Sequence, residues 1–305
     1  MEQPTSSGYV LFEGLDFTGK TTIAQRLAEK LSNESPLSAQ YKKGFFHRDN
    51  LEETETLAAK LDPRYKEMYF KSLYALDKVS QNLPPELVIQ DRYFPSILFY
   101  GMVVNGSSST NYSEMQNNFI LPRHVLLFEC SYDAKKERAK GREKFWRLER
   151  MVLESEDSHR RMQQVYRDII QEIGVGFTLI DTSDKSESDT LDKCYDTLVG
   201  SEILLEEVQI DGLFVSWEPR IYPSTAENYV ESLENGGIPK PLVIHRVFND
   251  ELGFVRDLVE DGRHRAYAHH LSGRETAKAF VQRIPVDKHY LDSVKLTPLK
   301  DFGVK

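Results

Sequence analysis

The clearest candidate for chemistry in the sequence is a phosphate-binding loop at residues 14–21. These residues read G-L-D-F-T-G-K-T and match the pattern G-x4-G-K-[S/T] without a gap. Glycines let backbone N–H groups turn toward phosphate oxygens, and a helix that begins near Lys20 directs its positive end at the same anion. We expect Lys20 to neutralise the β- and γ-phosphates of ATP and Thr21 to bind Mg²⁺. The predicted nucleotide site comprises Gly14, Phe17, Thr18, Gly19, Lys20, Thr21 and Thr22.

A strand must precede this loop and a helix must follow it. Residues 9–12 are an apolar run that ends near a glycine, and residues 21–31 carry apolar side chains at helical spacing. Further strands are predicted at 40–46, 87–90, 124–128 and 177–180, with helices at 52–82, 93–102, 133–172 and 187–200. This alternation predicts an α/β fold, a P-loop NTPase-type parallel sheet with helices on both faces and ligands at the carboxyl ends of its strands.

The pattern changes near residue 205. Strands are predicted at 213–216, 241–244, 255–259 and 276–283, with helices at 225–234 and 265–271. This predicts two domains, one spanning residues 1–204 and a smaller α/β domain spanning residues 205–305.

Composition narrows the class of protein. The 305 residues are 40% hydrophobic and 11% aromatic, which argues against wholesale disorder. A net charge of −9 argues against general nucleic-acid coating but leaves room for a local basic groove. Cys130 and Cys194 give no metal-ligand spacing. Because the sequence shows no signal peptide and no membrane-spanning run, we expect a cytoplasmic protein without membrane partners.

The sequence resembles the thymidylate kinase family over about residues 8–200, most clearly at two motifs. The first is F-E-G-L-D at 12–16 followed by G-K-T-T at 19–22, and the second is D-R-Y-F-P-S at 91–96. The resemblance implies that Asp16 approaches the sugar 3′-hydroxyl of the acceptor and that Arg92 contacts the acceptor phosphate. It also implies that Asp91 acts near Mg²⁺ and the transferred phosphoryl group.

The resemblance is weaker around a predicted arginine-bearing lid. Leu121 and Pro122 precede a strand, and Asp133, Arg138 and Arg142 follow it, as at the lid entrance of the family. Arg138 and Arg142, together with Arg147, would close over ATP and exclude water. The alternative is a solvated helix face whose arginines pair with Glu137, Glu143 and Glu149.

Several departures concern the acceptor. The family's R-E-P is replaced by G-F-F-H-R-D at 44–49, where His47 or Arg48 would have to serve. The family's A-D-R reads A-L-D-K at 75–78, and bulky Phe17 stands where the family prefers a small residue. The sequence therefore predicts donor chemistry more firmly than the acceptor. A dTMP-like acceptor is favoured, and a nucleoside or modified nucleotide is the alternative.

The second domain resembles the ParB/sulfiredoxin superfamily over about residues 207–290, through D-G-R-H-R at 261–265. Asp261, Gly262, His264 and Arg265 would form a phosphate site at a helix start. The alternative is that His264 and Arg265 are structural. Arg263 stands where sulfiredoxin has its cysteine, so sulfinic-acid repair is not expected. A serine-type kinase activity would need a carboxylate base, for which Glu218 is the candidate.

Three functions follow from these patterns. The leading one is an ATP- and Mg²⁺-dependent kinase of a nucleoside or nucleotide, in which the second domain handles a further phosphate. The second is a kinase acting on a DNA base or end, which would bind DNA in a salt-sensitive manner. The third is a non-catalytic, nucleotide-gated binding module. The family resemblance also makes a homodimer possible.

Overall fold

The computed structural model describes residues 8–35, 37–46, 54, 56–58, 60–80, 87–105, 118–142, 145, 147–199, 204–216, 223–237, 240–249, 253–286 and 296–301. The chain divides into two compact units. The first comprises residues 1–35 and 39–203, and the second comprises residues 36–38 and 204–305.

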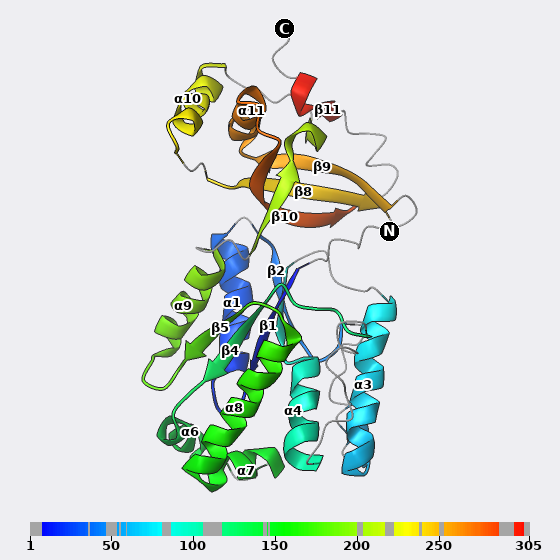
Figure 1. Cartoon of the computed structure of the whole chain (residues 1–305), viewed down its shortest axis with the longest axis vertical. Coiled ribbons are helices and arrows are strands. Elements are labelled where there is room, and N and C mark those ends of the chain that lie inside the picture. Colours follow the sequence, from blue (N-terminus) through cyan, green and yellow to red (C-terminus); the bar gives the residue numbers. More distant parts are fainter. Residues whose placement is uncertain are drawn as a thin grey trace. The chain divides into compact units, whose positions relative to one another are not determined.

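A parallel sheet forms the centre of the first unit (Figure 1). Its strands are β1 (Tyr9–Gly14), β2 (Ala39–Lys43), β3 (Leu87–Asp91), β4 (His124–Glu129) and β5 (Phe177–Asp181), in the order β2-β3-β1-β4-β5. Every neighbouring pair is parallel. Strands β1, β3 and β4 are buried along their whole length, as expected for a sheet covered on both faces.

Helices cover both faces of this sheet. They are α1 (Lys20–Glu34), α3 (Pro63–Ser80), α4 (Phe94–Asn105), α6 (Tyr132–Ala139), α7 (Arg147–Glu154), α8 (Glu156–Ile173) and α9 (Glu187–Val199). Helix α1 packs against α9, whereas α4 packs against both α3 and α8 (Figure 1). Because side chains alternate along a strand, Tyr9 and Leu11 enter the core formed with α3, α4 and α8. The predicted parallel α/β architecture is confirmed for this unit.

The prediction of one continuous helix over residues 133–172 is wrong, because the described residues of this stretch form three helices. Helix α6 ends at Ala139, and Gly141 follows it with a φ of 86°. Helix α7 ends at Glu154, and the hydroxyl of Ser155 then accepts a hydrogen bond from the Ser158 N–H at the start of α8. A left-handed glycine and a serine cap thus divide one charged stretch into three helices.

Other boundaries differ by a few residues. Helix α3 begins at Pro63 and not at residue 52, since proline suits the first helical position, although 54 and 56–58 are also helical. Strand β2 ends at Lys43, before Gly44 with a φ of 81°. Helix α11 (Arg263–Leu271) begins two residues earlier than predicted.

The second unit is built on a mixed sheet of different topology. Its strands are β6 (Leu205–Gln209), β7 (Leu213–Ser216), β8 (Leu242–Asn249), β9 (Gly253–Asp261), β10 (Thr276–Pro285) and β11 (Leu296–Pro298), in the order β11-β7-β9-β8-β10-β6. Helices α10 (Pro223–Glu234) and α11 pack together. A small core unites the sheet with α11 through residues such as Ile244, Val259 and Ala266. Sequence reasoning missed β6 and β11.

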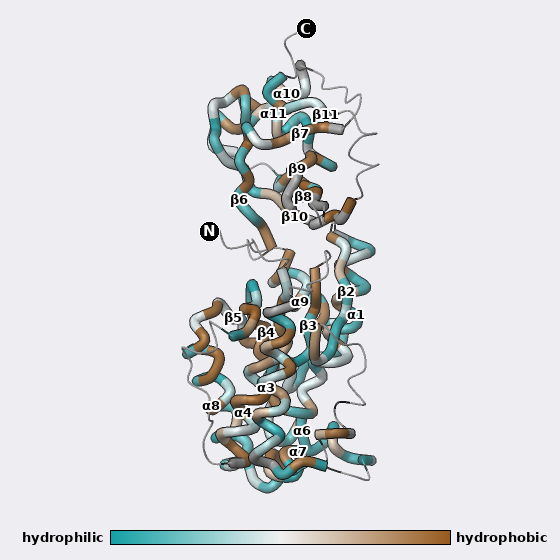
Figure 2. The backbone as a smooth tube through the Cα atoms, turned by 90° about the vertical axis from the view of Figure 1, so that its right-hand side faces the viewer, coloured by the Kyte–Doolittle hydropathy of each residue, from teal (hydrophilic) through white to brown (hydrophobic). Residues whose placement is uncertain are grey.

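Hydropathy follows this architecture. Figure 2 shows β3 and β4 in brown at the centre of the first unit, whereas its helices alternate between teal and brown. Within the described part of the chain, no helix combines the length and the apolar character that crossing a bilayer would demand.

Candidate functional site

The phosphate loop joins the central strand β1 to helix α1. Gly14 ends β1 with a φ of 138°, and a Cβ atom there would lie 2.2 Å from the carbonyl oxygen of Phe128 in β4. Gly19 precedes α1 with a φ of 81° and has open space where a Cβ would point. Only glycine fits both positions without strain. The loop therefore curls at the carboxyl end of the sheet, beside the ends of β3 and β4.

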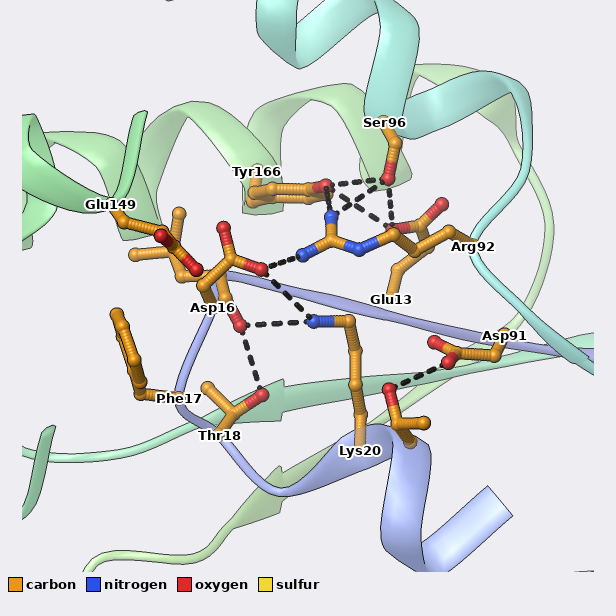
Figure 3. Close-up of polar contacts among 12 residues, drawn as sticks. Glu13, Asp16, Phe17, Thr18, Lys20, Asp91, Arg92, Ser96, Glu149 and Tyr166 are labelled. Atoms are coloured by element: carbon orange, nitrogen blue, oxygen red, sulfur yellow. Dashed lines mark hydrogen bonds and ion pairs between the residues drawn. The ribbon is translucent and has the colours of Figure 1, made fainter. Parts of the chain in front are cut away.

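Lys20 folds back over this loop (Figure 3). Its Nζ donates a hydrogen bond to the Leu15 carbonyl oxygen at 3.2 Å and lies 3.9 Å from Asp16 Oδ1. The Thr18 hydroxyl donates to the same carbonyl at 3.0 Å. Burial lowers the pKa of Lys20 to about 8, and the positive charge of Arg92 acts in the same direction. A phosphate that replaced the Leu15 carbonyl would restore the ordinary pKa of this amine.

Asp16 and Arg92 form an ion pair across the site. Arg92 follows β3, and its Nη2 donates to Asp16 Oδ1 at 2.5 Å. Burial tends to raise the pKa of Asp16, but Arg92 and Lys20 outweigh it and hold the value at about 2. Arg92 has a φ of 64°, a left-handed conformation that is strained for a side chain of this size. The Gln90 amide holds it there by donating to the Arg92 carbonyl at 2.8 Å.

Glu13, Ser96 and Tyr166 support this arginine from behind. Fully buried Glu13 accepts hydrogen bonds from the Tyr93 N–H at 3.0 Å, Ser96 at 2.8 Å and Tyr166 at 3.2 Å. Arg92 Nη1 in turn donates to Ser96 at 3.1 Å and Tyr166 at 3.3 Å (Figure 3). Sequence reasoning gave these residues no role. Glu13 and Ser96 lie inside the two quoted motifs and could have been singled out, whereas nothing local marked Tyr166 in α8.

Thr21 and Asp91 meet where a metal ion was predicted. The Thr21 hydroxyl donates to Asp91 Oδ2 at 2.6 Å, and the Tyr41 hydroxyl donates to the same oxygen at 3.2 Å. Asp91 is fully buried, and its Oδ1 has no hydrogen-bond partner among the described residues. A hydroxyl and a carboxylate are ligands that Mg²⁺ accepts beside substrate phosphates. These two residues therefore fit the ion, although no cluster of three or more His, Cys, Asp or Glu occurs in the described ranges.

Two of the three predicted lid arginines, Arg138 and Arg142, contact Phe17. Arg138 in α6 donates to the Phe17 carbonyl at 3.1 Å and to Thr182 Oγ1 at 2.9 Å. The guanidinium of Arg142 lies 5.2 Å from the centre of the Phe17 ring and pairs with Glu149. Arg142 follows α6 and is not on a helix, but its ion pair with Glu149 is one of the contacts that the alternative of a solvated, paired face predicts. Phe17 has a φ of 65° and packs edge-on against Phe145.

Other predicted residues lie outside these contacts. Thr22 is exposed in the first turn of α1, and Arg147 is exposed at the start of α7. His47, Arg48 and Glu218 lie outside the described residues.

The second unit has a separate cavity at the start of α11. It measures about 430 Å³ and is lined by Tyr229, Glu260, Asp261, Gly262, Arg263, His264 and Arg265. Arg265 Nη2 donates to Asp261 Oδ2 at 3.0 Å and to the Pro241 carbonyl at 3.3 Å. The predicted phosphate-site residues other than Glu218 thus line one cavity. The contact between Arg265 and Asp261 also agrees with the alternative prediction that Arg265 has a structural role.

Comparison with known proteins bears on the first unit. A thymidylate kinase from Staphylococcus haemolyticus is 24% identical over 203 residues, which cover 63% of this chain and 98% of that protein. One from Mycoplasmopsis agalactiae is 26% identical over 175 residues, covering 53% of this chain and 81% of that protein. A crystal structure of thymidylate kinase from Ehrlichia chaffeensis aligns with a TM-score of 0.47 and 18% identity, covering 63% of this chain and 99% of that one. The sequence model of the family described as thymidylate kinase matches residues 12–191, which is more than half of the chain. This match agrees with the geometry of the phosphate loop, and the chain belongs to the thymidylate kinase family of P-loop nucleotide kinases.

Proposed function

We propose that this protein transfers the γ-phosphoryl group of ATP to a nucleoside or nucleoside monophosphate, with a dTMP-like acceptor favoured. The observation that carries the proposal is the cluster of Lys20, Asp16 and Arg92 at the mouth of the phosphate loop. Phosphoryl transfer asks a protein for positioning and positive charge, and needs no covalent intermediate. This cluster supplies two cations and a hydrogen-bond acceptor around one point.

Each side chain then has a definite task. The loop N–H groups and Lys20 bind the donor phosphates, and Thr21 and Asp91 would hold Mg²⁺, which neutralises charge on them. Arg92 exchanges its partner Asp16 for an acceptor phosphate, and Asp16 becomes free to accept a hydrogen bond from a sugar hydroxyl. Glu13, Ser96 and Tyr166 keep the guanidinium oriented during this exchange.

The partly buried guanidinium of Arg92 favours a monophosphate over a nucleoside. A nucleoside would leave the guanidinium with Asp16 as its only ion-pair partner, whereas a monophosphate offers it a doubly charged, bidentate partner. The absent R-E-P motif keeps modified nucleotides open as acceptors.

The test is ADP release with Mg²⁺-ATP against nucleosides, nucleoside monophosphates and free serine. Lys20→Met should reduce acceptor-dependent turnover at least 100-fold, about 2.7 kcal/mol of barrier. Lys30→Met on the same helix, whose amine instead contacts Asp192, is the control and should keep wild-type turnover. Unchanged turnover in Lys20→Met would refute the proposal. ATP binding without turnover on any acceptor would favour the nucleotide-gated module.

For the second unit we propose a phosphate- or nucleotide-binding role in a ParB/sulfiredoxin-like domain spanning residues 205–305. The cavity at the start of α11 is the observation that favours it. Calorimetric titration of ADP and pyrophosphate should show a component of the heat that Lys20→Met leaves in place and that adding His264→Ala removes. Serine-stimulated ADP release that His264→Ala abolishes would instead indicate a serine-type kinase. Salt-sensitive DNA binding would favour a nucleic-acid acceptor.

We also propose that the first unit forms a homodimer through α3. Tyr65, Met68 and Leu76 expose 60%, 59% and 49% of their surface, and their spacing places them on one side of the helix. Exposed apolar side chains gathered in this way are typical of an interaction surface.

A further inference from the structure

Lys135 is a buried lysine near the phosphate loop, and its amine makes no hydrogen bond to any residue that the structure describes. It lies in the first turns of α6, directly after β4, and none of its surface is exposed. Its Nζ has no hydrogen-bond partner among the described residues. The next residue differs, because Lys136 is exposed and its amine lies 5.2 Å from the centre of the Tyr132 ring. Burial of an unpaired ammonium is costly, so this position calls for an explanation.

The charges around Lys135 are those of the phosphoryl-transfer site. Burial lowers its pKa to about 8; Cys130 and Asp16 raise it, while Lys20 and Arg92 lower it further. Asp16 already has two cations beside it, Arg92 and Lys20. This single carboxylate is already shared by two cations, and the Lys135 amine makes no hydrogen bond to it.

Cys130 does not supply the missing negative charge. Burial raises the pKa of its thiol, which keeps the sulfur protonated, and Sγ donates to the Phe17 carbonyl at 3.9 Å. His159, which also lies near Lys135, directs Nε2 to the Cys130 carbonyl at 3.0 Å and has its pKa lowered by burial. Neither group offers an anion near neutral pH.

We propose that Lys135 is a further phosphate-binding residue of this kinase, whose ammonium contacts a phosphate oxygen of the donor nucleotide. The inference rests on the proposed function of the same site. A four-carbon stem lets the amine reach across from α6 while the helix stays in place. The donor side is indicated because both Cys130, just before α6, and Arg138, within α6, donate to the Phe17 carbonyl of the phosphate loop.

The test compares Lys135→Met with Lys136→Met, a matched change at the exposed neighbour. ADP affinity is measured by calorimetry, apo stability by thermal unfolding, and kcat and KM by ADP release with varied ATP and dTMP. Lys135→Met should weaken ADP binding about 10-fold, equivalent to about 1.4 kcal/mol. It should also lower kcat/KM for ATP at least 10-fold and leave the KM for dTMP within threefold. Its apo melting temperature should equal or exceed the wild-type value, because an unpaired charge has been removed. Lys136→Met should match the wild type throughout.

Three results would overturn the inference: wild-type ADP affinity in Lys135→Met, a loss confined to dTMP, or a fall in apo melting temperature that accompanies the loss of affinity. The last would make the lysine structural. Failure of the proposed function is distinguishable, because wild-type protein that releases no ADP with any acceptor would refute that function while the ADP-binding comparison still decides the role of Lys135.

Discussion

Of the substitutions that add one methyl group to the phosphate loop, Gly14→Ala should lower the stability of the first unit the most. Gly14 pairs with Phe128 where β1 meets β4, and the new Cβ would lie 2.2 Å from the Phe128 carbonyl oxygen. That oxygen belongs to the backbone of a fully buried strand, so it has no rotamer by which to move away. Strand separation by about 1 Å would be needed to reach ordinary contact, in an interior that is close-packed.

The expected magnitude combines two effects. A non-glycine residue at a φ of 138° costs about 1–2 kcal/mol, and the displaced strand pair adds about 2–3 kcal/mol. A total of about 3–5 kcal/mol corresponds to a fall of roughly 6–20 °C in the melting temperature of a unit of this size.

The assay is thermal unfolding followed by circular dichroism, with Gly19→Ala as the matched control. Gly19 also has a positive φ, of 81°, but no heavy atom lies within 4 Å of its added Cβ. Gly19→Ala should therefore lower the free energy of unfolding by only about 1 kcal/mol, while it weakens ADP binding. Equal destabilisation by the two substitutions, or a Gly14→Ala melting temperature within about 3 °C of wild type, would refute the reasoning.

Three further predictions concern the site and its assembly. Phe17→Gly relieves about 1 kcal/mol of left-handed backbone strain, so the melting temperature should stay within about 3 °C of the wild-type value. The substitution also removes the ring under Arg142, so the KM for ATP should rise severalfold in initial-rate measurements. A large loss of stability would contradict this reasoning. Because burial holds the pKa of Lys20 and of Lys135 at about 8, both amines are partly deprotonated at pH 8 in the free protein. Bound phosphate should raise both pKa values, so calorimetry in two buffers at pH 8 should show proton uptake on ADP binding; proton release would have the wrong sign. Met68→Lys should convert the proposed dimer to a monomer in light scattering at unchanged melting temperature, and an unaltered mass would exclude α3 as the interface.

The sequence predicted those parts of the site that are formed by residues close together along the chain. The phosphate loop needs Gly14, Gly19 and Lys20 at fixed spacing within one strand–turn–helix unit, so eight consecutive residues were enough to predict it. Asp91 and Arg92 were predicted because residues 91–96 resemble a motif of the family, and their place at a strand end agreed with a site at the carboxyl edge of a parallel sheet.

Long-range partners could not be found in this way. Tyr166 reaches Glu13 across 153 positions, and only the packing of α8 against α4 brings them together. Lys135 looked like one of many charged residues on a helix, because burial depends on how α6 lies against the loop. The three-way division of residues 133–172 was missed because the charged pattern continues through Gly141 and Ser155, whose capping roles were not weighed.

The position of β1 in the sheet also bears on how the protein is made. Residues 9–14 are synthesised before both of their partner strands, because Tyr9 pairs with Val88 and Val10 pairs with His124. Strand β1 therefore stays without both of its neighbouring strands until more than a hundred further residues have been synthesised. Parallel pairings of such high sequence separation form slowly, and an unpaired apolar strand is a target for chaperones and for aggregation. Nascent chains arrested before residue 124 should thus lack nucleotide binding, although they already carry every residue of the phosphate loop.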